Sequence, residues 1–395
     1  MLNLHIVPHT HWDREWYLPF QAFRIKPVHL MDGLLTLLDQ DPTFAHFMLD
    51  GQTVLLEDYL QVRSEREEDL IRHVRSGRIA IGPWYVLPDE FLVSPESIVR
   101  NLLRGGEICA RFGKRMNIGY IPDPFGHIGQ MPQILSGFGL EAACIERGPA
   151  DEPCELLWEA PDGTRIMLLN LRDGYYNAAR LPADPEAFAS FLRQRRDSLS
   201  THSLVSQRLF LNGTDHQEPQ PELPSALRAA RLDPDRAWIS TLSSYVAAVQ
   251  QEVHTRSLSL PIVKGELRSP QRHHLLAGVL SSRSWIKQRN HACEILLERW
   301  AEPFAAWAHV FAGQRSDRSV WTGHLQTPRL SDPRGLLREA WRLLLQCHPH
   351  DSIWGCSVDG VHDAMRVRFE EVEQIGEEIM RQSLRAVAAS VDMVS

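Results

Sequence analysis

The sequence lacks the features of a membrane or secreted protein. No apolar run approaches the roughly 20 residues that a bilayer-spanning helix requires. The N-terminus has no basic segment followed by an apolar stretch and a small-residue cleavage site, so no signal peptide is predicted. Only six of the 395 residues are cysteine, and they are scattered, which favours free thiols over a disulfide framework. We therefore expect a cytoplasmic protein without membrane contact.

The sequence also lacks an excess of basic residues. The formal net charge is -8, with acidic and basic residues interspersed, so the basic face that is typical of nucleic-acid-binding domains is missing. Hydrophobic residues make up 43% and charged residues 23% of the chain, which is ordinary for a globular protein with a large core. Because 395 residues exceed one ordinary domain, we expect two domains and no nucleic-acid partner.

Short apolar runs alternate with helix-like segments through about residue 250. The predicted strands cover residues 2–7, 47–49, 79–81, 118–121, 142–145, 166–171, 209–211 and 238–239. The predicted helices between them cover residues 28–38, 65–76, 95–111, 130–138, 185–195 and 225–231. Such alternation predicts an α/β fold with a mainly parallel sheet. The number of repeats favours closure into a barrel, although the sequence alone leaves an open doubly wound sheet as an alternative.

The pattern changes after about residue 255. Residues 264–271 have the character of a linker, and residues 275–311, 333–346 and 361–387 are helix-periodic. Three such helices predict a small all-α bundle, so we divide the chain into domains at 1–258 and 259–395. Residues 348–355, between the last two helices, are polar, aromatic and interrupted by proline and glycine. This segment could reach back to the mouth of the predicted barrel.

Polar side chains with metal-binding chemistry follow the predicted strands. His11 and Asp13 come just after the first strand and are two residues apart, so on an extended segment their side chains point the same way. Asp123 follows the fourth strand, and His350 lies in the returning segment. Two imidazole nitrogens and two carboxylate oxygens would suit one zinc ion and leave room for a substrate oxygen.

A second, local donor set is Cys347, His350 and Cys356. Thiolates bind zinc well, but two cysteines and one histidine fall short of the four ligands of a closed structural site. We therefore expect the dispersed set in preference to the local one.

Two aspartates suit the cleavage of a glycosidic bond. Asp123 and Asp215 each follow a predicted strand, and this reaction requires one carboxyl group as nucleophile and another as proton donor. Arg147 could orient a neighbouring carboxylate and keep it ionised, with an ordinary salt bridge as the alternative interpretation. Trp16 and Phe125 could stack on a sugar ring, with core packing as their alternative.

These residues stand in motifs that resemble the zinc-dependent α-mannosidases of glycoside hydrolase family 38. The motifs occur in the family's order and spread over nearly the whole chain: His9-Thr10-His11-Trp12-Asp13 with Trp16, Gly82-Pro83-Trp84-Tyr85-Val86-Leu87-Pro88-Asp89-Glu90, Asp123-Pro124-Phe125-Gly126-His127, Arg147, Gly213-Thr214-Asp215 and His350-Asp351-Ser352-Ile353. The resemblance implies an α/β fold with a (β/α)7 barrel followed by a three-helix bundle that contributes a zinc-ligand loop. It also implies hydrolysis of α-mannosides with retention, through a covalent mannosyl-aspartate.

The same resemblance implies a role for each matching residue. One Zn²⁺ per chain would be bound by His11, Asp13, Asp123 and His350. Asp123 would be the nucleophile and Asp215 the general acid/base. The expected substrate contacts are Trp16, Trp84, Phe125, Arg147 and Asp351.

The resemblance leaves the substrate open between an oligosaccharide and a small mannoside. The version with Trp12 is similar to bacterial members, including those that cleave mannosyl- or phosphomannosyl-glycerate, and this favours a bacterial cytoplasmic enzyme. A phosphate pocket would need basic residues, for which Arg14, Arg172 and Arg180 are the candidates.

Family members continue past the helical bundle into β-rich domains, which we expect to be absent from this chain. An exposed apolar surface could then promote a homo-oligomer. Two other functions remain as alternatives: a piece that binds sugar without turning it over, and a zinc-dependent carbohydrate deacetylase or amidohydrolase, which would use a metal-bound water as nucleophile.

Overall fold

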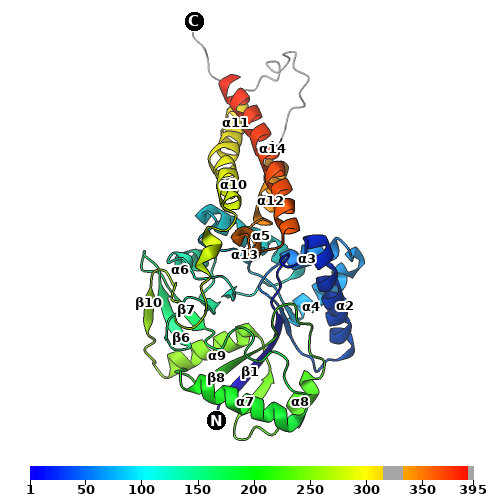
Figure 1. Ribbon diagram of the computed structural model, residues 1–395, viewed down its shortest axis with the longest axis vertical. Helices are drawn as coiled ribbons and strands as arrows, with labels where there is room; N and C mark the ends of the chain where they lie inside the picture. The colour runs from blue at the N-terminus through cyan, green and yellow to red at the C-terminus, as the bar shows by residue number, and fades with distance from the viewer. Residues whose placement is uncertain (315–331, 390–395) are drawn as a thin grey trace.

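The computed structural model describes residues 1–314 and 332–389 (Figure 1). Its strands are β1 Asn3–Thr10, β2 Phe47–Leu49, β3 Ile79–Ala80, β4 Gly119–Ile121, β5 Ala142–Ile145, β6 Glu155–Glu159, β7 Arg165–Asn170, β8 Gln207–Asn212, β9 Arg236–Ile239 and β10 Ile262–Lys264. All eight predicted strands are confirmed, with bounds that differ by at most three residues. The sequence analysis missed β6 and β10, which pair with each other at one edge of a sheet.

Helices lie between and after these strands. In the first part they are α1 Phe20–Phe23, α2 Ile25–Gln40, α3 Val54–Leu60, η1 Ser64–Arg66, α4 Glu67–Arg75, α5 Pro95–Phe112, α6 Met131–Gly137, α7 Pro185–Ser200, α8 Leu223–Ala229 and α9 Leu242–Thr255. In the second part they are η2 Ala277–Leu280, α10 Ser284–Ile295, η3 Leu296–Ala301, α11 Glu302–Gln314, α12 Arg334–Leu345, α13 His350–Trp354 and α14 Asp359–Ala389.

The strands form two five-stranded sheets. One has the order β3-β2-β1-β8 with β9 also paired to β1, and the other has the order β10-β6-β7-β5-β4. All pairs are parallel except β6 with β7, which are antiparallel. The α/β fold is confirmed. The expected closed barrel is not, because hydrogen bonds between the described strands form two separate sheets. Between the two sheets the described residues have an isolated bridge, which joins Ile81 after β3 to Arg115 before β4.

The helices in the second part pack against one another along their lengths (Figure 1). They share one buried apolar cluster, which includes Ile286 on α10, Leu297 on η3, Leu344 on α12 and Phe369 on α14. The helix predicted over residues 275–311 is broken, because residues 281–283 are non-helical and Arg283 has a left-handed φ of 44°. The short helix α13 lies where these helices meet the α/β part (Figure 1).

Local sequence signals explain where several helices begin. Ser94 accepts a hydrogen bond from the Ser97 amide before α5, and Asp184 accepts one from the Ala187 amide before α7. Each is followed by a proline at the first helical position, which has no amide hydrogen to leave unsatisfied. Thr241 accepts a hydrogen bond from the Ser244 amide before α9, without a following proline. The sequence analysis did not predict that helix.

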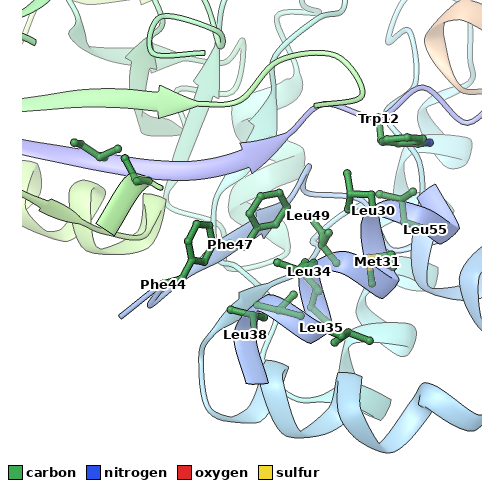
Figure 2. Packing of buried hydrophobic residues seen from close by; sticks show 14 of the residues in the cluster. Trp12, Leu30, Met31, Leu34, Leu35, Leu38, Phe44, Phe47, Leu49 and Leu55 are labelled. Carbon is green, nitrogen blue, oxygen red and sulfur yellow. The ribbon is translucent and has the colours of Figure 1, made fainter. Parts of the chain in front are cut away.

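An apolar cluster beside β1 and β2 supports the segment that carries His11 and Asp13. Figure 2 shows Phe44, Phe47 and Leu49 packed against side chains of α2, with Trp12 at the rim of the same cluster. Trp12 is 3% exposed, so it anchors the backbone between His11 and Asp13 to the core. Burial of an aromatic of this size is worth a few kcal/mol, and this fixes the direction of its neighbours.

Two further expectations concern membrane spans and disulfides. No described helix combines the length and the apolar character needed to span a bilayer. All six cysteines lie in the described part of the chain, and none of them forms a disulfide bond, as predicted.

Candidate active site

The segment after β1 places His11 and Asp13 in a buried position. His11 is 0% and Asp13 is 5% exposed. The Nδ1 atom of His11 lies 3.0 Å from the Asp50 carboxylate, and Nε2 lies 3.2 Å from Oδ1 of Asp13. Asp50 also accepts hydrogen bonds from the Trp12 amide and the Gln52 side chain. A carboxylate on Nδ1 fixes the ring and leaves Nε2 to act as a ligand.

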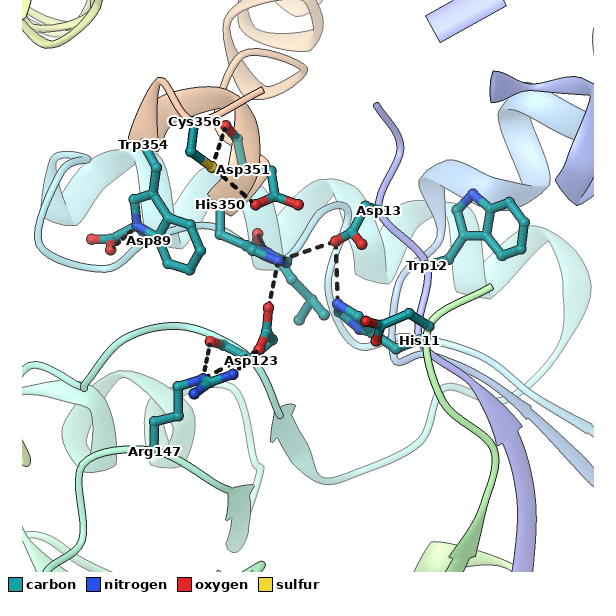
Figure 3. A network of polar contacts seen from close by, with 12 residues as sticks. His11, Trp12, Asp13, Asp89, Asp123, Arg147, His350, Asp351, Trp354 and Cys356 are labelled. Carbon is teal, nitrogen blue, oxygen red and sulfur yellow. Dashed lines mark hydrogen bonds and ion pairs between the residues drawn. The ribbon is translucent and has the colours of Figure 1, made fainter. Parts of the chain in front are cut away.

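His350 is brought to the same point from the helical part of the chain. Its amide donates to the Leu87 carbonyl at 3.0 Å, and Pro349 forms a bridge with Pro88. The Nδ1 atom of His350 lies 3.2 Å from the Leu87 carbonyl oxygen. Its Nε2 lies 3.1 Å from Oδ1 of Asp13 and 3.3 Å from Oδ2 of Asp123 (Figure 3). The predicted return of residues 348–355 to the α/β part is therefore confirmed.

Three of the converging atoms make no hydrogen bond. Nε2 of His11, Oδ1 of Asp13 and Nε2 of His350 are buried and unpartnered, which is costly unless another group satisfies them. Oδ1 of Asp13 lies 3.2 Å from Nε2 of His11 and 3.1 Å from Nε2 of His350, and Oδ2 of Asp123 lies 3.3 Å from the same His350 atom. These distances are close to the separation of about 3.3 Å between ligands on a tetrahedral zinc ion with bonds of about 2.0 Å. His11, Asp123 and His350 form one group that could hold a metal ion, and Asp13, which lies beside both histidines, forms a second group with His350 and Asp351.

The charges at this point are those of a cation site. Burial opposes protonation of His11, but Asp50 and Asp13 outweigh it and raise the pKa of His11 well above its usual value. Burial likewise opposes protonation of His350, whose pKa is raised by Asp123 and Asp13. Burial favours the neutral form of Asp123, yet His350 holds the pKa of Asp123 below its usual value. A divalent cation would replace the two imidazolium protons.

Arg147 contacts Asp123, so the neighbouring carboxylate that the sequence analysis left unnamed is that of Asp123. Its Nη2 donates to Oδ1 of Asp123 at 2.8 Å, and its Nε donates to the same oxygen at 3.2 Å. The other carboxylate oxygen, Oδ2, faces His350. The two oxygens of Asp123 thus have different partners, so the rotation of this carboxylate is fixed.

Asp215 lies beside His11 at the end of β8. The two residues form a parallel bridge, and this close approach requires Gly213, because a Cβ there would come within 2.0 Å of the His9 carbonyl oxygen. Oδ1 of Asp215 accepts a hydrogen bond of 2.7 Å from the Tyr175 hydroxyl. Burial, with Asp123 and then Asp215, raises the pKa of Tyr175, so this hydroxyl keeps its proton.

The two aromatic residues predicted to stack on a sugar ring, Phe125 and Trp16, have different neighbours. Phe125 stacks on Trp354 with ring centroids 3.9 Å apart, and the Arg147 guanidinium lies 4.9 Å from the Phe125 centroid. Trp16 is half-buried beside Tyr17. Both Phe125 and Trp16 lie next to residues of the site.

Trp84 was predicted to contact the substrate, and its position in the structure corrects that prediction. It is 0% exposed, and its Nε1 donates to the Tyr120 carbonyl at 3.1 Å. It packs in an apolar cluster with Ile98 and Leu102. Trp84 therefore supports the loop from inside and has no free face for a sugar.

Among the described residues, the local zinc set, which the sequence analysis ranked below the dispersed one, does not assemble. Cys347 is buried in the apolar cluster of the helices, and in the described residues no group that could hold a metal contains either cysteine. Cys356 instead lies 3.2 Å from Oδ1 of Asp351. Asp351 is buried, and it groups with Asp13 and His350; burial and the nearby Asp13 raise the pKa of Asp351 to about 8.

Two of the three phosphate candidates are engaged elsewhere. Arg14 donates to Asp58 at 2.8 Å and Arg172 to Asp151 at 2.6 Å, and both guanidinium side chains are buried. They are therefore ill placed to bind a phosphate. Arg180 is exposed.

Sequence reasoning assigned no role to several residues that complete the site. Asp50 and the Leu87 carbonyl orient the two histidines, and Tyr175 contacts Asp215. His216 lies with its Nε2 3.2 Å from Oδ2 of Asp13. Their positions in the sequence could have indicated such a role, because Asp50 directly follows a predicted strand and His216 directly follows Asp215.

Comparisons with known proteins agree with this geometry. The model of the glycosyl hydrolases family 38 N-terminal domain matches residues 1–266, and the model of the alpha mannosidase middle domain matches residues 274–387. The chain belongs to glycoside hydrolase family 38.

Several family 38 relatives are similar over almost the whole chain. A protein of Halalkalibacterium halodurans, provisionally named as a mannosylglycerate hydrolase, is 37% identical over 98% of this chain and 43% of its own length. Human alpha-mannosidase 2C1 is 24% identical over 98% of this chain and 35% of its own length. The chain thus spans less than half the length of these relatives.

Solved structures show the same relationship. The crystal structure of an alpha-mannosidase from Enterococcus faecalis superposes with a TM-score of 0.89 at 38% identity, covering 98% of this chain and 43% of that one. A second family 38 protein from Enterococcus faecalis gives a TM-score of 0.78 at 34% identity, covering 98% of this chain and 40% of that one. The fold described above is therefore that of family 38.

Proposed function

We propose that the protein is a retaining α-mannosidase that hydrolyses terminal non-reducing α-D-mannosides. The observation that carries the proposal is the convergence of His11, Asp13, Asp123 and His350 with three unpartnered buried ligand atoms. Residues 1–258 would form the catalytic domain and residues 259–395 a helical bundle that supplies His350. The free thiols favour the cytoplasm as its compartment.

These four side chains would hold one Zn²⁺ per chain, since two histidines and two carboxylates fit its preferences. When bound, the ion supplies positive charge that stabilises sugar hydroxyl oxygens in the oxocarbenium-like transition state. Asp50 and the Leu87 carbonyl would keep the two imidazole rings in the ligating orientation.

The two aspartates would carry out a double displacement. Asp123 attacks the anomeric carbon while the bond to the leaving oxygen breaks and Asp215 donates a proton to that oxygen. Asp215 then accepts a proton from a water molecule, which attacks the anomeric carbon and releases Asp123. Arg147 holds Oδ1 of Asp123, and Tyr175 donates to Oδ1 of Asp215, so the second oxygen of Asp215 is left to carry the transferred proton.

The first test is to trap the covalent intermediate. A 2-deoxy-2-fluoro α-mannoside with an activated leaving group should label the protein, and peptide mass spectrometry should find the sugar on Asp123. A carbohydrate deacetylase or amidohydrolase would form no such adduct, because its nucleophile is water. Stabilisation of the chain by mannose in a thermal melt, without an adduct or hydrolysis, would favour a piece that only binds sugar.

A hollow next to Phe125 is our candidate for the leaving-group subsite. Its volume is about 200 Å³, and its lining includes Asp89, Phe91, Phe125, Arg268 and Leu276. Arg268 is 45% exposed, lies 3.9 Å from Glu266 and stacks over the Phe91 ring at 4.6 Å. A cation beside the leaving group would favour an anionic one, such as the glycerate of mannosylglycerate.

The Arg268→Met variant distinguishes the two substrate classes. We expect KM for mannosylglycerate to rise about tenfold more than KM for a neutral aryl α-mannoside, because one charged hydrogen bond is lost. Steady-state kinetics on both substrates measure the difference. Arg272→Met is the matched control, since that guanidinium lies toward Asp151. Equal changes with both substrates would contradict an anionic subsite at Arg268.

A further inference from the structure

A buried ion pair joins the two segments that carry the metal ligands. Nη1 and Nη2 of Arg368 on α14 donate to the two carboxylate oxygens of Glu15 at 2.7 and 2.6 Å. Glu15 is 0% exposed, and the Arg368 side chain is 11% exposed. Glu15 lies two residues after Asp13 in the loop that follows β1. The pair therefore connects the first ligand segment to the longest helix of the chain.

The same carboxylate also contacts the second ligand segment. Oε1 of Glu15 accepts a hydrogen bond of 3.0 Å from the Ser352 hydroxyl, and Ser352 follows His350 by two residues on α13. Arg368 also donates to the Gln346 carbonyl at 2.9 Å, just before that segment. Glu15 and Arg368 thus lie between the loop that carries Asp13 and the helix that carries His350.

Other contacts also hold this loop. Arg14 donates to Asp58 on α3, and the Val358 amide donates to the Trp16 carbonyl at 2.9 Å. The Glu15–Arg368 pair is the contact among these that reaches both ligand segments at once. A buried ion pair often adds little stability, since desolvation offsets its attraction. Its contribution here would be a fixed geometry between the groups that carry it.

We infer that Glu15 and Arg368 are positioning residues that hold His350 against Asp13 and so set the affinity of the metal site. This inference rests on the proposed metal binding. Ligands supplied by two separate segments bind weakly unless those segments are held at the right spacing, and outer contacts of a metal site commonly change affinity 10- to 100-fold. Zinc affinity, more than folding, should therefore depend on this pair.

The test compares two double variants, each of which removes one ion pair. Glu15→Gln with Arg368→Met removes the pair without leaving a buried charge unpaired, and the glutamine still accepts from Ser352. Arg100→Met with Glu302→Gln is the control. That pair joins α5 to α11 at 3.0 and 2.7 Å, also across the two parts of the chain, but it contacts neither ligand segment. A third variant, Arg368→Lys, keeps the charge at the site.

Zinc affinity is measured by competition with a chromophoric chelator, and the metal-free proteins are melted in parallel. We expect zinc binding at least tenfold weaker in the Glu15/Arg368 variant, with partial recovery in Arg368→Lys, while the metal-free protein melts like the control variant. Unchanged affinity, or an equal loss in the control, would overturn the inference and leave the metal site standing. A wild-type chain that binds no zinc would overturn both this inference and the proposed function.

Discussion

Replacement of Asp123 by alanine is expected to lower kcat/KM for an aryl α-mannoside by a factor on the order of 10⁵, as removal of a catalytic nucleophile does in other hydrolases. The variant loses the attacking oxygen and one metal ligand together. Asp123→Asn separates these effects, because the amide keeps the shape of the side chain and an oxygen ligand. We expect it to impair zinc binding much less than it impairs catalysis.

Steady-state kinetics and zinc competition on the same samples provide the readout. Asp162→Ala is the matched control, since Asp162 contacts Thr164 in an exposed turn between β6 and β7. It should leave both quantities unchanged. Full activity in Asp123→Ala or in Asp123→Asn would rule out Asp123 as the nucleophile.

Replacement of Asp215 by alanine should have an effect that depends on the leaving group. Loss of a general acid costs about 10²- to 10⁴-fold, and it should appear fully for leaving groups that need a proton. For an activated aryl α-mannoside, whose phenolate leaves unprotonated, kcat/KM should fall far less. The Tyr175 hydroxyl loses its partner in this variant, so Tyr175→Phe reports the contribution of that contact alone.

A series of aryl α-mannosides with leaving groups of different pKa measures this dependence. In the wild type kcat/KM should vary weakly along the series, and in Asp215→Ala it should vary steeply. A uniform loss for all leaving groups would show that Asp215 acts on structure or binding and would contradict the proton-transfer role.

The periodic features of the sequence predicted the local structure well. The runs at residues 47–49 and 142–145 are strands with those bounds, because continuous burial in a parallel sheet needs continuous apolar residues. Pairing partners are not encoded in this local pattern. β9 pairs with β1 and does not extend the other sheet. The alternation of strands and helices alone therefore could not predict whether the sheets close into a barrel.

The candidate site illustrates the same division. Strand ends predicted where His11, Asp13 and Asp123 lie, but the approach of His350 to Asp13 joins residues 337 positions apart. The polar, aromatic character of residues 348–355 raised that possibility, and the family motif made it an expectation. Trp84 was misassigned because a buried and an exposed tryptophan look alike in a sequence, and Asp50 was left without a role because aspartate before glycine is also typical of a turn.

The most direct test of this account is the zinc content of the purified chain, measured by elemental analysis beside His350→Ala. The account predicts one zinc per chain in the wild type and its loss in the variant, because the ligand from the helical part is removed. His348→Ala is the control, since His348 pairs with Asn290 at 2.7 Å and should leave the zinc in place. A wild-type chain without metal, or zinc retained in His350→Ala, would contradict a site built from both parts of the chain.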